Sequence, residues 1–211
     1  MSLMGLDIGT TGTKANVFNE RGELISSAYR EYPLLYPRPG WIELDPEQVW
    51  DNVRAAVAQA ACGAPGDPVR ALAISVLGEA AVPVDKHGAS LANSIVGFDN
   101  RAAELFERWI ANVDAAEIMR ITGQPPSQMF TIVKLMWIKQ HQPDLYRKIH
   151  RLLTFGEFAQ HKMGLEPRID YSVAARTMAF DIHRKCYSER VCALAGVSPE
   201  LFGPAVSTGH V

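Results

Sequence analysis

The segment Met4–Lys14, with the sequence MGLDIGTTGTK, decides the fold. A short apolar run covers residues 3–8, glycine and threonine crowd the next positions, and residues 15–18 resume an extended pattern. This order predicts a strand, a tight turn and a second strand. Gly9 and Gly12 are expected to adopt positive φ in the turn, because glycine has no Cβ to oppose that conformation.

Polar groups around this turn suit a phosphate with its metal ion. Successive N–H groups in such a turn form a nest for anions. Thr10, Thr11 and Thr13 add hydroxyl donors, and Lys14 adds a positive charge. Asp7 ends a strand that we expect to be buried, where a carboxylate is costly unless it binds a cation or accepts hydrogen bonds. A phosphate ester with Mg²⁺ would satisfy all of these groups.

An ordinary hairpin with a threonine-rich surface turn explains the same residues, and the turn alone does not decide between the two interpretations. Two other phosphate-binding motifs are excluded. A Walker loop ends in Gly-Lys-Ser/Thr and leads into a helix, and a dinucleotide fingerprint also needs a helix after the turn. Here residues 15–18 predict a strand instead.

Composition narrows the class of protein. The chain has 211 residues, a length that suits one large domain or two small ones. Hydrophobic residues make up 47% of it, enough to form a full core. A net charge of −2 gives no sign of a nucleic-acid or anionic-membrane partner. Cys62, Cys186 and Cys192 are odd in number and unpatterned, which favours reduced thiols and a cytoplasmic protein. No apolar run reaches membrane-spanning length, and no signal peptide is visible.

The remaining pattern predicts an α/β domain with a mixed sheet. Three extended runs are expected to form an antiparallel meander, over residues 3–8, 14–19 and 23–31. A buried parallel strand is expected over residues 69–76, with residues 80–84 paired beside it and another strand over residues 94–98. Helix caps are expected at Asp45, Asp114 and Ser188, and helix ends at Gly63, Gly123 and Gly196. No linker that would mark two domains is visible.

Polar residues follow the ends of two of these strands. Glu79 comes shortly after residues 69–76, and Asp99 and Arg101 follow residues 94–98. Open α/β sheets bind ligands beyond such strand ends. The simpler interpretations are a solvated turn carboxylate for Glu79 and a helix N-cap for Asp99. Lys134, on a helical segment further along, is expected on a solvated face.

Five blocks of the sequence resemble one known family. Met4–Lys14 resembles the first phosphate loop of the sugar-kinase, Hsp70 and actin superfamily, and residues 17–24 resemble the hairpin that follows it in FGGY carbohydrate kinases. Gly40–Pro46, GWIELDP, resembles the family's Gly-Trp-x-Glu-x-Asp-Pro block, which Hsp70 and actin lack. Lys134–Ile138 and Asp170–Asp181 resemble later blocks. The chain is thus similar to the N-terminal half of an FGGY kinase, most like the xylulokinase branch.

The resemblance implies an actin-like, ribonuclease H-like ATPase fold, with an antiparallel three-strand meander followed by parallel strands and flanking helices. It implies ATP and Mg²⁺ as cofactors and a sugar or polyol as substrate, with no nucleic-acid or membrane partner, and it allows a homodimer. Residues 1–211 would be the sugar-binding domain, incomplete at its C-terminal end. The general base and the ATP-binding C-terminal domain would lie beyond Val211, so this chain alone is expected to be catalytically inactive.

The resemblance also assigns roles to residues. Asp7 would organise Mg²⁺, directly or through water. The transferred phosphate would be held by Gly9, Thr10, Thr11, Thr13 and Lys14, and the sugar would face Gly78, Glu79, Asp99 and Arg101. The family glutamine before Gly78 is Leu77 here, and the family tryptophan is Gly97, which enlarges or reshapes the pocket. The alternative is a non-catalytic sugar-binding or regulatory half-kinase.

Overall fold

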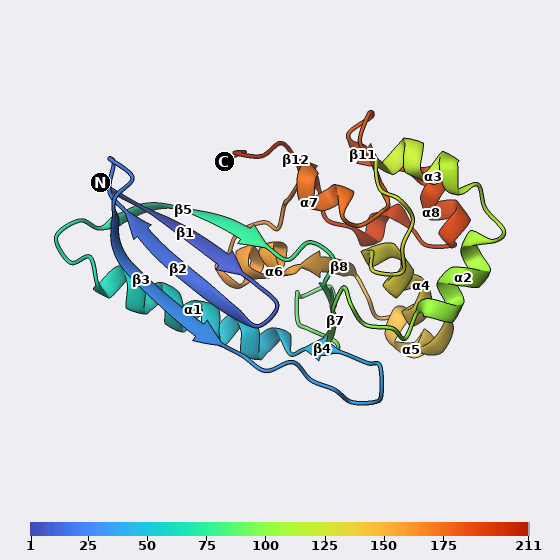
Figure 1. Cartoon of the computed structure of the whole chain (residues 1–211), viewed down its shortest axis with the longest axis horizontal. Helices are drawn as coiled ribbons and strands as arrows, with labels where there is room; N and C mark the ends of the chain where they lie inside the picture. Colours follow the sequence, from blue (N-terminus) through green and yellow to red (C-terminus); the bar gives the residue numbers. More distant parts are fainter. Residues whose placement is uncertain (211) are drawn as a thin grey trace. The chain divides into compact units, whose positions relative to one another are not determined.

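The structure is a computed structural model that describes residues 1–210, so Val211 lies outside the described residues. It divides into two compact units (Figure 1). Unit 1 comprises Met1–Leu35 and Leu44–Leu77, and unit 2 comprises Tyr36–Glu43 and the chain from Gly78 onward. The chain passes into unit 2 for a short segment, returns, and leaves again. No single linker separates the units.

Unit 1 is a four-stranded sheet with one long helix. Its strands are β1 (Ser2–Ile8), β2 (Gly12–Phe18), β3 (Leu24–Glu31) and β5 (Val69–Val76), in the order β3-β2-β1-β5. β1, β2 and β3 pair antiparallel, and β5 pairs parallel to β1. The predicted meander is therefore confirmed, and so is the parallel direction of the strand that follows it.

Helix α1 (Pro46–Cys62) covers one face of this sheet, along β2 and β3 (Figure 1). The helix begins where predicted, because the Asp45 side chain accepts hydrogen bonds from the N–H groups of Glu47 and Gln48. The core of unit 1 combines residues at helical spacing in α1 with alternate residues of β1 and β2: Met4, Leu6, Ile8, Ala15, Val17, Val49, Val53, Ala56 and Ala60. Three- to four-residue spacing on the helix and alternation on the strands are the periods expected of buried faces.

β5 differs from its prediction in burial. Its sequence led us to expect a fully buried strand, yet each of its residues keeps part of its surface exposed. The reason is position: β5 lies at the edge of the sheet, and α1 packs on β2 and β3. A run of apolar residues shows that a strand can be buried, but not which elements cover it.

A second four-stranded sheet belongs to unit 2 except for Leu44, the last residue of its strand β4. β4 (Glu43–Leu44), β7 (Ser94–Ile95), β6 (Ala81–Val84) and β8 (Arg151–Thr154) lie in that order. The expected pairing of residues 80–84 beside residues 69–76 is wrong, because β6 pairs antiparallel with β7 and β8 instead. The strand expected over residues 94–98 ends at Ile95, since the N–H of Asp99 turns back to the carbonyl of Val96.

Helices make up most of unit 2. They are α2 (Ala103–Ile110), α3 (Ala115–Thr122), α4 (Thr131–His141), α5 (Pro143–Tyr146), α6 (Phe155–Lys162), α7 (Tyr171–Ala175), α8 (Glu189–Ala195) and the 3₁₀ turn Pro199–Leu201. Two short pairs complete the unit: β9 (Ile169–Asp170) with β12 (Ala205–Val206), and β10 (Phe180–Asp181) with β11 (Cys186–Tyr187). The predicted caps at Asp114 and Ser188 accept N–H bonds, and Gly123 and Gly196 end their helices in the left-handed conformation.

α4 runs through the core of unit 2. Ile132, Val133 and Leu135 are fully buried on different sides of this helix, and Lys134 is only 4% exposed. The expectation that Lys134 lies on a solvated face is therefore wrong, because this helix is packed all round rather than amphipathic. No helix among residues 1–210 is long and apolar enough to cross a membrane.

Candidate functional site

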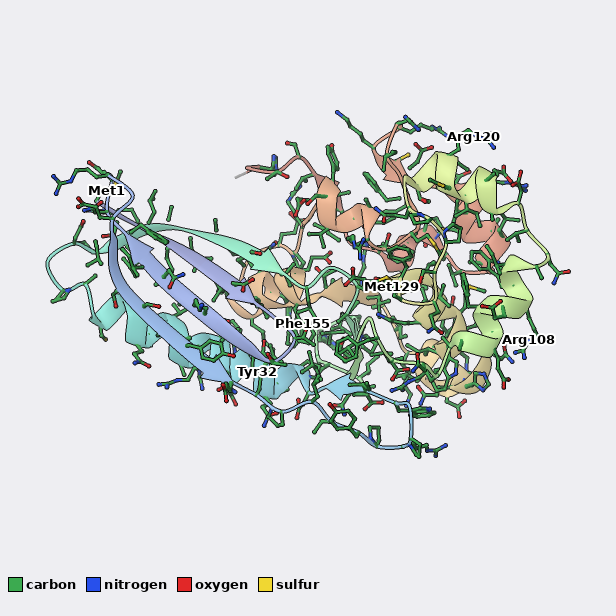
Figure 2. The ribbon with its side chains drawn as sticks, viewed as in Figure 1. Met1, Tyr32, Arg108, Arg120, Met129 and Phe155 are labelled. Carbon is green, nitrogen blue, oxygen red and sulfur yellow. The ribbon has the colours of Figure 1, made fainter. Side chains whose placement is uncertain are left out.

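The turn between β1 and β2 is closed by hydrogen bonds within unit 1. The N–H of Gly9 donates to the carbonyl of Gly12 at 2.9 Å. Tyr32, labelled in Figure 2, holds the turn from the end of β3: its hydroxyl donates to the Gly9 carbonyl at 2.7 Å and its N–H to the Thr11 carbonyl at 3.2 Å. Burial, with a smaller effect of the Asp7 charge, raises the pKa of Tyr32 well above its usual value. The Tyr32 hydroxyl therefore stays a donor at neutral pH.

The two glycines of this turn are needed for a different reason from the one predicted. Neither Gly9 nor Gly12 adopts positive φ. A Cβ on Gly12 would instead lie 2.7 Å from the ring of Tyr29, and a Cβ on Gly9 would lie 3.1 Å from the carbonyl oxygen of Gly12. Glycine at these positions permits the close approach of neighbouring atoms rather than an unusual backbone conformation.

The turn leaves backbone donors free. Among the described residues, none accepts a hydrogen bond from the N–H groups of Thr10 and Thr11. The Thr13 hydroxyl, in contrast, is fully buried and donates to the carbonyl of Asp7 at 2.9 Å, so it serves the fold. An anion at this turn would therefore meet N–H groups before it met the Thr13 hydroxyl.

Asp7 and Lys14 face each other across the hairpin. They are paired in the β1–β2 register, and both side chains lie on the exposed face. The expected desolvation cost at Asp7 is wrong, because strand alternation turns its side chain outward. Within the described residues, no hydrogen bond or ion pair engages the Asp7 carboxylate, and the Lys14 Nζ contacts only the Tyr29 ring, 5.9 Å from its centroid.

These groups fit a magnesium ion that arrives with a phosphate ligand. In residues 1–210 no cluster of three metal-ligating side chains is present. Mg²⁺ bound through one carboxylate, phosphate oxygens and waters needs no such cluster.

The carboxyl end of β5 lies beside the same turn, since Ile8 pairs with Val76 and the N–H of Leu77 donates to the Ile8 carbonyl at 3.1 Å.

Glu79, in unit 2, is held by both its backbone and its side chain. Its carbonyl oxygen accepts hydrogen bonds from Thr131 Oγ1 at 3.0 Å and from Lys134 Nζ at 2.9 Å. Its carboxylate Oε1 accepts from Nε of Arg176 at 2.6 Å and from Nη2 of the same guanidinium. Glu79 is therefore fixed by ion pairing rather than being a freely solvated turn carboxylate. The partner Arg176 was not among the predicted site residues, although it lies in a block that resembles the family.

Lys134 has an altered acidity. Burial lowers its pKa from 10.5 to about 7, while the charges of Glu79 and Asp99 act in the opposite direction. Its ammonium group serves as the donor that fixes the Glu79 carbonyl.

Asp99 and Arg101 form a buried ion pair in unit 2. Asp99 Oδ2 accepts from the Ile42 N–H and from Arg101 Nη2, and Oδ1 accepts from the Arg101 N–H and Nε at 2.8 and 2.9 Å. Arg101 also pairs with Glu43 at 2.9 Å. The Arg101 guanidinium lies 4.0 Å from the ring centroid of Trp41 and 5.2 Å from that of Trp137.

The polar atoms of Asp99 and Arg101 are therefore already engaged in hydrogen bonds and ion pairs within the protein. The side chains of Asp99 and Arg101 are 1% and 3% exposed. Their contact with a sugar stays a prediction, but their arrangement already explains why both are present: they hold the turn that follows β7. The Asp99 side chain acts on the backbone of Ile42 and Arg101 rather than as a simple helix cap.

Gly97 lies beside Glu79. A Cβ on Gly97 would lie 3.6 Å from Glu79 Oε2 and 3.9 Å from the methyl group of Met129, in the loop that leads into α4 (Figure 2). Both distances are ordinary van der Waals contacts, so a Cβ at this position would pack against Glu79 and Met129. The structure thus brings Gly97, Glu79 and Gly78 together with Arg176 in unit 2.

Comparison with known proteins identifies the family. Residues 2–211 match the model of the N-terminal domain of the FGGY family of carbohydrate kinases. The chain belongs to this family. A glycerol kinase from Thermococcus gammatolerans is 32% identical over 210 residues, which cover 97% of this chain and 42% of the relative. The match extends over all five blocks that resemble FGGY kinases in the sequence.

Solved structures confirm the fold class of this FGGY chain. The xylulose kinase from Rhodospirillum rubrum matches with a TM-score of 0.90 and 29% identity, over 98% of this chain and 43% of that one. The gluconate kinase from Lactobacillus acidophilus matches with a TM-score of 0.90 over 97% of this chain and 42% of that one, and at 23% identity it shows the fold alone. The fold is the mixed α/β, actin-like ATPase fold. The chain spans less than half the length of these relatives.

Proposed function

We propose that this chain is the sugar-binding part of a kinase that transfers a phosphoryl group from ATP to a hydroxyl of a sugar or polyol. The observation that carries the proposal is the β1–β2 turn, where free N–H groups lie next to the exposed and uncommitted Asp7 and Lys14. Phosphoryl transfer depends mainly on positioning and on stabilising charge at the phosphate oxygens. A turn of this kind supplies both.

Each group has a distinct part in this proposal. The N–H groups of Thr10 and Thr11 and the Lys14 ammonium would bind the transferred phosphate, and Asp7 would hold Mg²⁺, directly or through water. When bound, Mg²⁺ neutralises charge on the phosphate oxygens. In unit 2, Glu79 would accept a hydrogen bond from the substrate, while Asp99 and Arg101 support the turn beside it.

We base the proposed substrate class on the glycine at residue 97. A Cβ there would already contact Glu79 and Met129, so an aromatic side chain would take up volume beside Glu79 that glycine would leave to a ligand. A xylulokinase-like substrate, a chain of several hydroxyl-bearing carbons, would use that room better than glycerol would. We therefore favour a ketopentose or an aldonate over glycerol as the acceptor.

Two measurements test the proposal. First, glycerol, D-xylulose and D-gluconate are each added to the purified chain in a thermal-shift experiment, where a ligand that binds the folded form raises the Tm. Second, ADP release is followed for the whole protein and for residues 1–211 with MgATP and the same compounds. We expect a Tm increase with at least one compound and turnover by the whole protein only. No Tm increase and no ADP release by either form would refute the proposal, and turnover by residues 1–211 would refute the expected inactivity of this part alone.

A further inference from the structure

The ion pair between Arg176 and Glu79 uses only one of the two carboxylate oxygens. A guanidinium and a carboxylate usually pair through two N–H groups and two oxygens. Here Nε and Nη2 of Arg176 both donate to Glu79 Oε1. Among the described residues none donates to Oε2, which faces Gly97. One oxygen of Glu79 is thus bound within the protein, and the other is left free to accept a hydrogen bond.

Arg176 is itself held in place. Its Nη1 donates to Gln124 Oε1 at 3.3 Å, and its guanidinium lies 5.0 Å from the centre of the Phe130 ring. The next residue, Thr177, accepts a hydrogen bond through its carbonyl from the N–H of Ile132 at 3.0 Å, which ties the segment to α4. α4 also provides the two donors that fix the Glu79 carbonyl. Both partners of the ion pair are therefore anchored to the same helix.

Gly78 makes this approach feasible. A Cβ on Gly78 would lie 2.8 Å from Cγ of Arg176, closer than such atoms approach in folded proteins, and 3.1 Å from its Cβ, which is a tight contact. The aliphatic part of Arg176 lies across the Gly78 backbone and carries the guanidinium to Glu79. An alanine at residue 78 would push Arg176 away without changing a charge.

Asp99 offers the contrast within unit 2. Both of its oxygens accept two hydrogen bonds from protein groups, so neither is free. The Glu79 side chain is 16% exposed and keeps one free oxygen. Of these two carboxylates, Glu79 is the one able to accept a hydrogen bond from a ligand hydroxyl.

We propose that Arg176 is a positioning residue, which fixes Oε1 of Glu79 so that Oε2, on the side of Gly97, accepts a hydrogen bond from a substrate hydroxyl. This inference rests on the proposed function. Arg176 acts through Glu79 and does not contact the substrate. Removing the Arg176 guanidinium weakens substrate binding but leaves the residues of unit 1 that would bind the phosphate unchanged. KM therefore rises and kcat changes little.

The test compares three variants with a matched control. Arg176→Gln removes the cation, Arg176→Lys keeps the charge without the fork of donors, and Gly78→Ala displaces the guanidinium by steric contact. Arg190→Gln is the control, because Arg190 also pairs with a glutamate through Nε and Nη2, at 3.0 Å each, but it donates to both oxygens of Glu117 and lies on the surface of unit 2. The Kd for D-xylulose, D-gluconate and glycerol is measured by calorimetry, and KM and kcat are measured by ADP release from the whole protein.

We expect Arg176→Gln and Gly78→Ala to weaken binding of the best compound by about tenfold to a hundredfold, in line with loss of a hydrogen bond to a charged group. The control keeps its affinity. A further variant, Arg176→Gly, removes the whole side chain. Guanidinium chloride at about 20 mM, far below the concentrations that unfold proteins, restores part of its affinity, because the added cation occupies the vacated place. A purely structural role would lower the Tm of the variant without such recovery.

The outcomes separate this inference from the proposed function. If the unchanged protein binds a compound and both Arg176→Gln and Gly78→Ala bind it equally well, the positioning role is refuted and the kinase assignment stands. If Arg176→Gln does not fold, the affinities of Gly78→Ala and Arg176→Lys are compared with that of the unchanged protein instead. If the unchanged protein binds none of the three compounds and releases no ADP, both proposals fall.

Discussion

Glu157 gives a prediction about stability that is independent of any ligand. This side chain, at the start of α6, is 2% exposed. Its Oε2 accepts hydrogen bonds from the N–H and the hydroxyl of Thr154, both at 2.8 Å, but within the described residues Oε1 is buried with no partner. Burial raises the pKa of Glu157 from 4.5 to about 7, against the lowering effect of the Thr154 bonds.

The raised pKa fixes the sign of the effect. The folded protein binds the Glu157 proton more tightly than the unfolded chain does, so protonation of Glu157 stabilises the folded state. This stabilisation is complete below about pH 4.5 and is lost as the pH rises through about 7. The difference between the two pKa values corresponds to about 3 kcal/mol in the free energy of unfolding. Glu157→Gln keeps the shape and the hydrogen-bond acceptor but removes the charge, so the variant lacks this pH dependence.

Urea denaturation at pH 5, 6, 7 and 8 measures the effect. The free energy of unfolding of Glu157→Gln, minus that of the unchanged protein, is expected to increase across this range by about 2–3 kcal/mol. Glu104→Gln serves as the control, because the Glu104 side chain is 92% exposed on α2, and its curve should run parallel to that of the unchanged protein. If the difference in free energy of unfolding between Glu157→Gln and the unchanged protein stayed constant from pH 5 to 8, the pKa of Glu157 would not be raised in the folded protein.

Three other predictions concern the candidate site. Asp99→Ala leaves the buried Arg101 without its closest partner and should lower the free energy of unfolding by about 3 kcal/mol, measured by urea denaturation; a change below about 1 kcal/mol would contradict the buried pair. Gly97→Trp should narrow the set of compounds that raise the Tm, whereas an unchanged set would mean that residue 97 does not face the ligand. Lys14→Ala should lower kcat of the whole protein by about 10²–10³-fold with little change in sugar KM, and a rise in sugar KM alone would argue against its role at the phosphate.

Local signals in the sequence were sufficient for much of the fold. Asp45, Asp114 and Ser188 each cap a helix through hydrogen bonds to N–H groups only two or three residues away. Extended runs separated by turn residues identified the β1–β3 meander for the same reason, because each pairing joins neighbours in the chain. Interactions of short range can be deduced from short segments.

Interactions between distant residues could not be deduced in this way. Arg176 and Glu79 are 97 residues apart, and neither position has a pattern that names its partner. The burial of Lys134 was missed because periodicity gives the direction of a side chain on its helix but not what packs against it. The exposure of β5 and the sheet to which β6 belongs also depend on elements elsewhere in the chain. At Gly12, sequence showed that glycine was needed but not that the Tyr29 ring was the cause.

The path of the chain between the units sets an order of events during synthesis. The segment Tyr36–Glu43 belongs to unit 2, but its partners are made later: Asp99, which binds the N–H of Ile42, follows it by 57 residues. At about 5–20 residues per second, the ribosome delivers Asp99 about 3–11 s after Ile42. In that interval Met1–Leu35 and Leu44–Leu77 can assemble the sheet and helix of unit 1 around a segment that still lacks its partners. Trp41, which packs edge-on against Trp137 at 5.1 Å between ring centroids, stays uncovered until α4 has emerged. Apolar surface that is exposed during synthesis favours aggregation, so Tyr36–Glu43 is the segment of unit 2 that must wait longest for its partners.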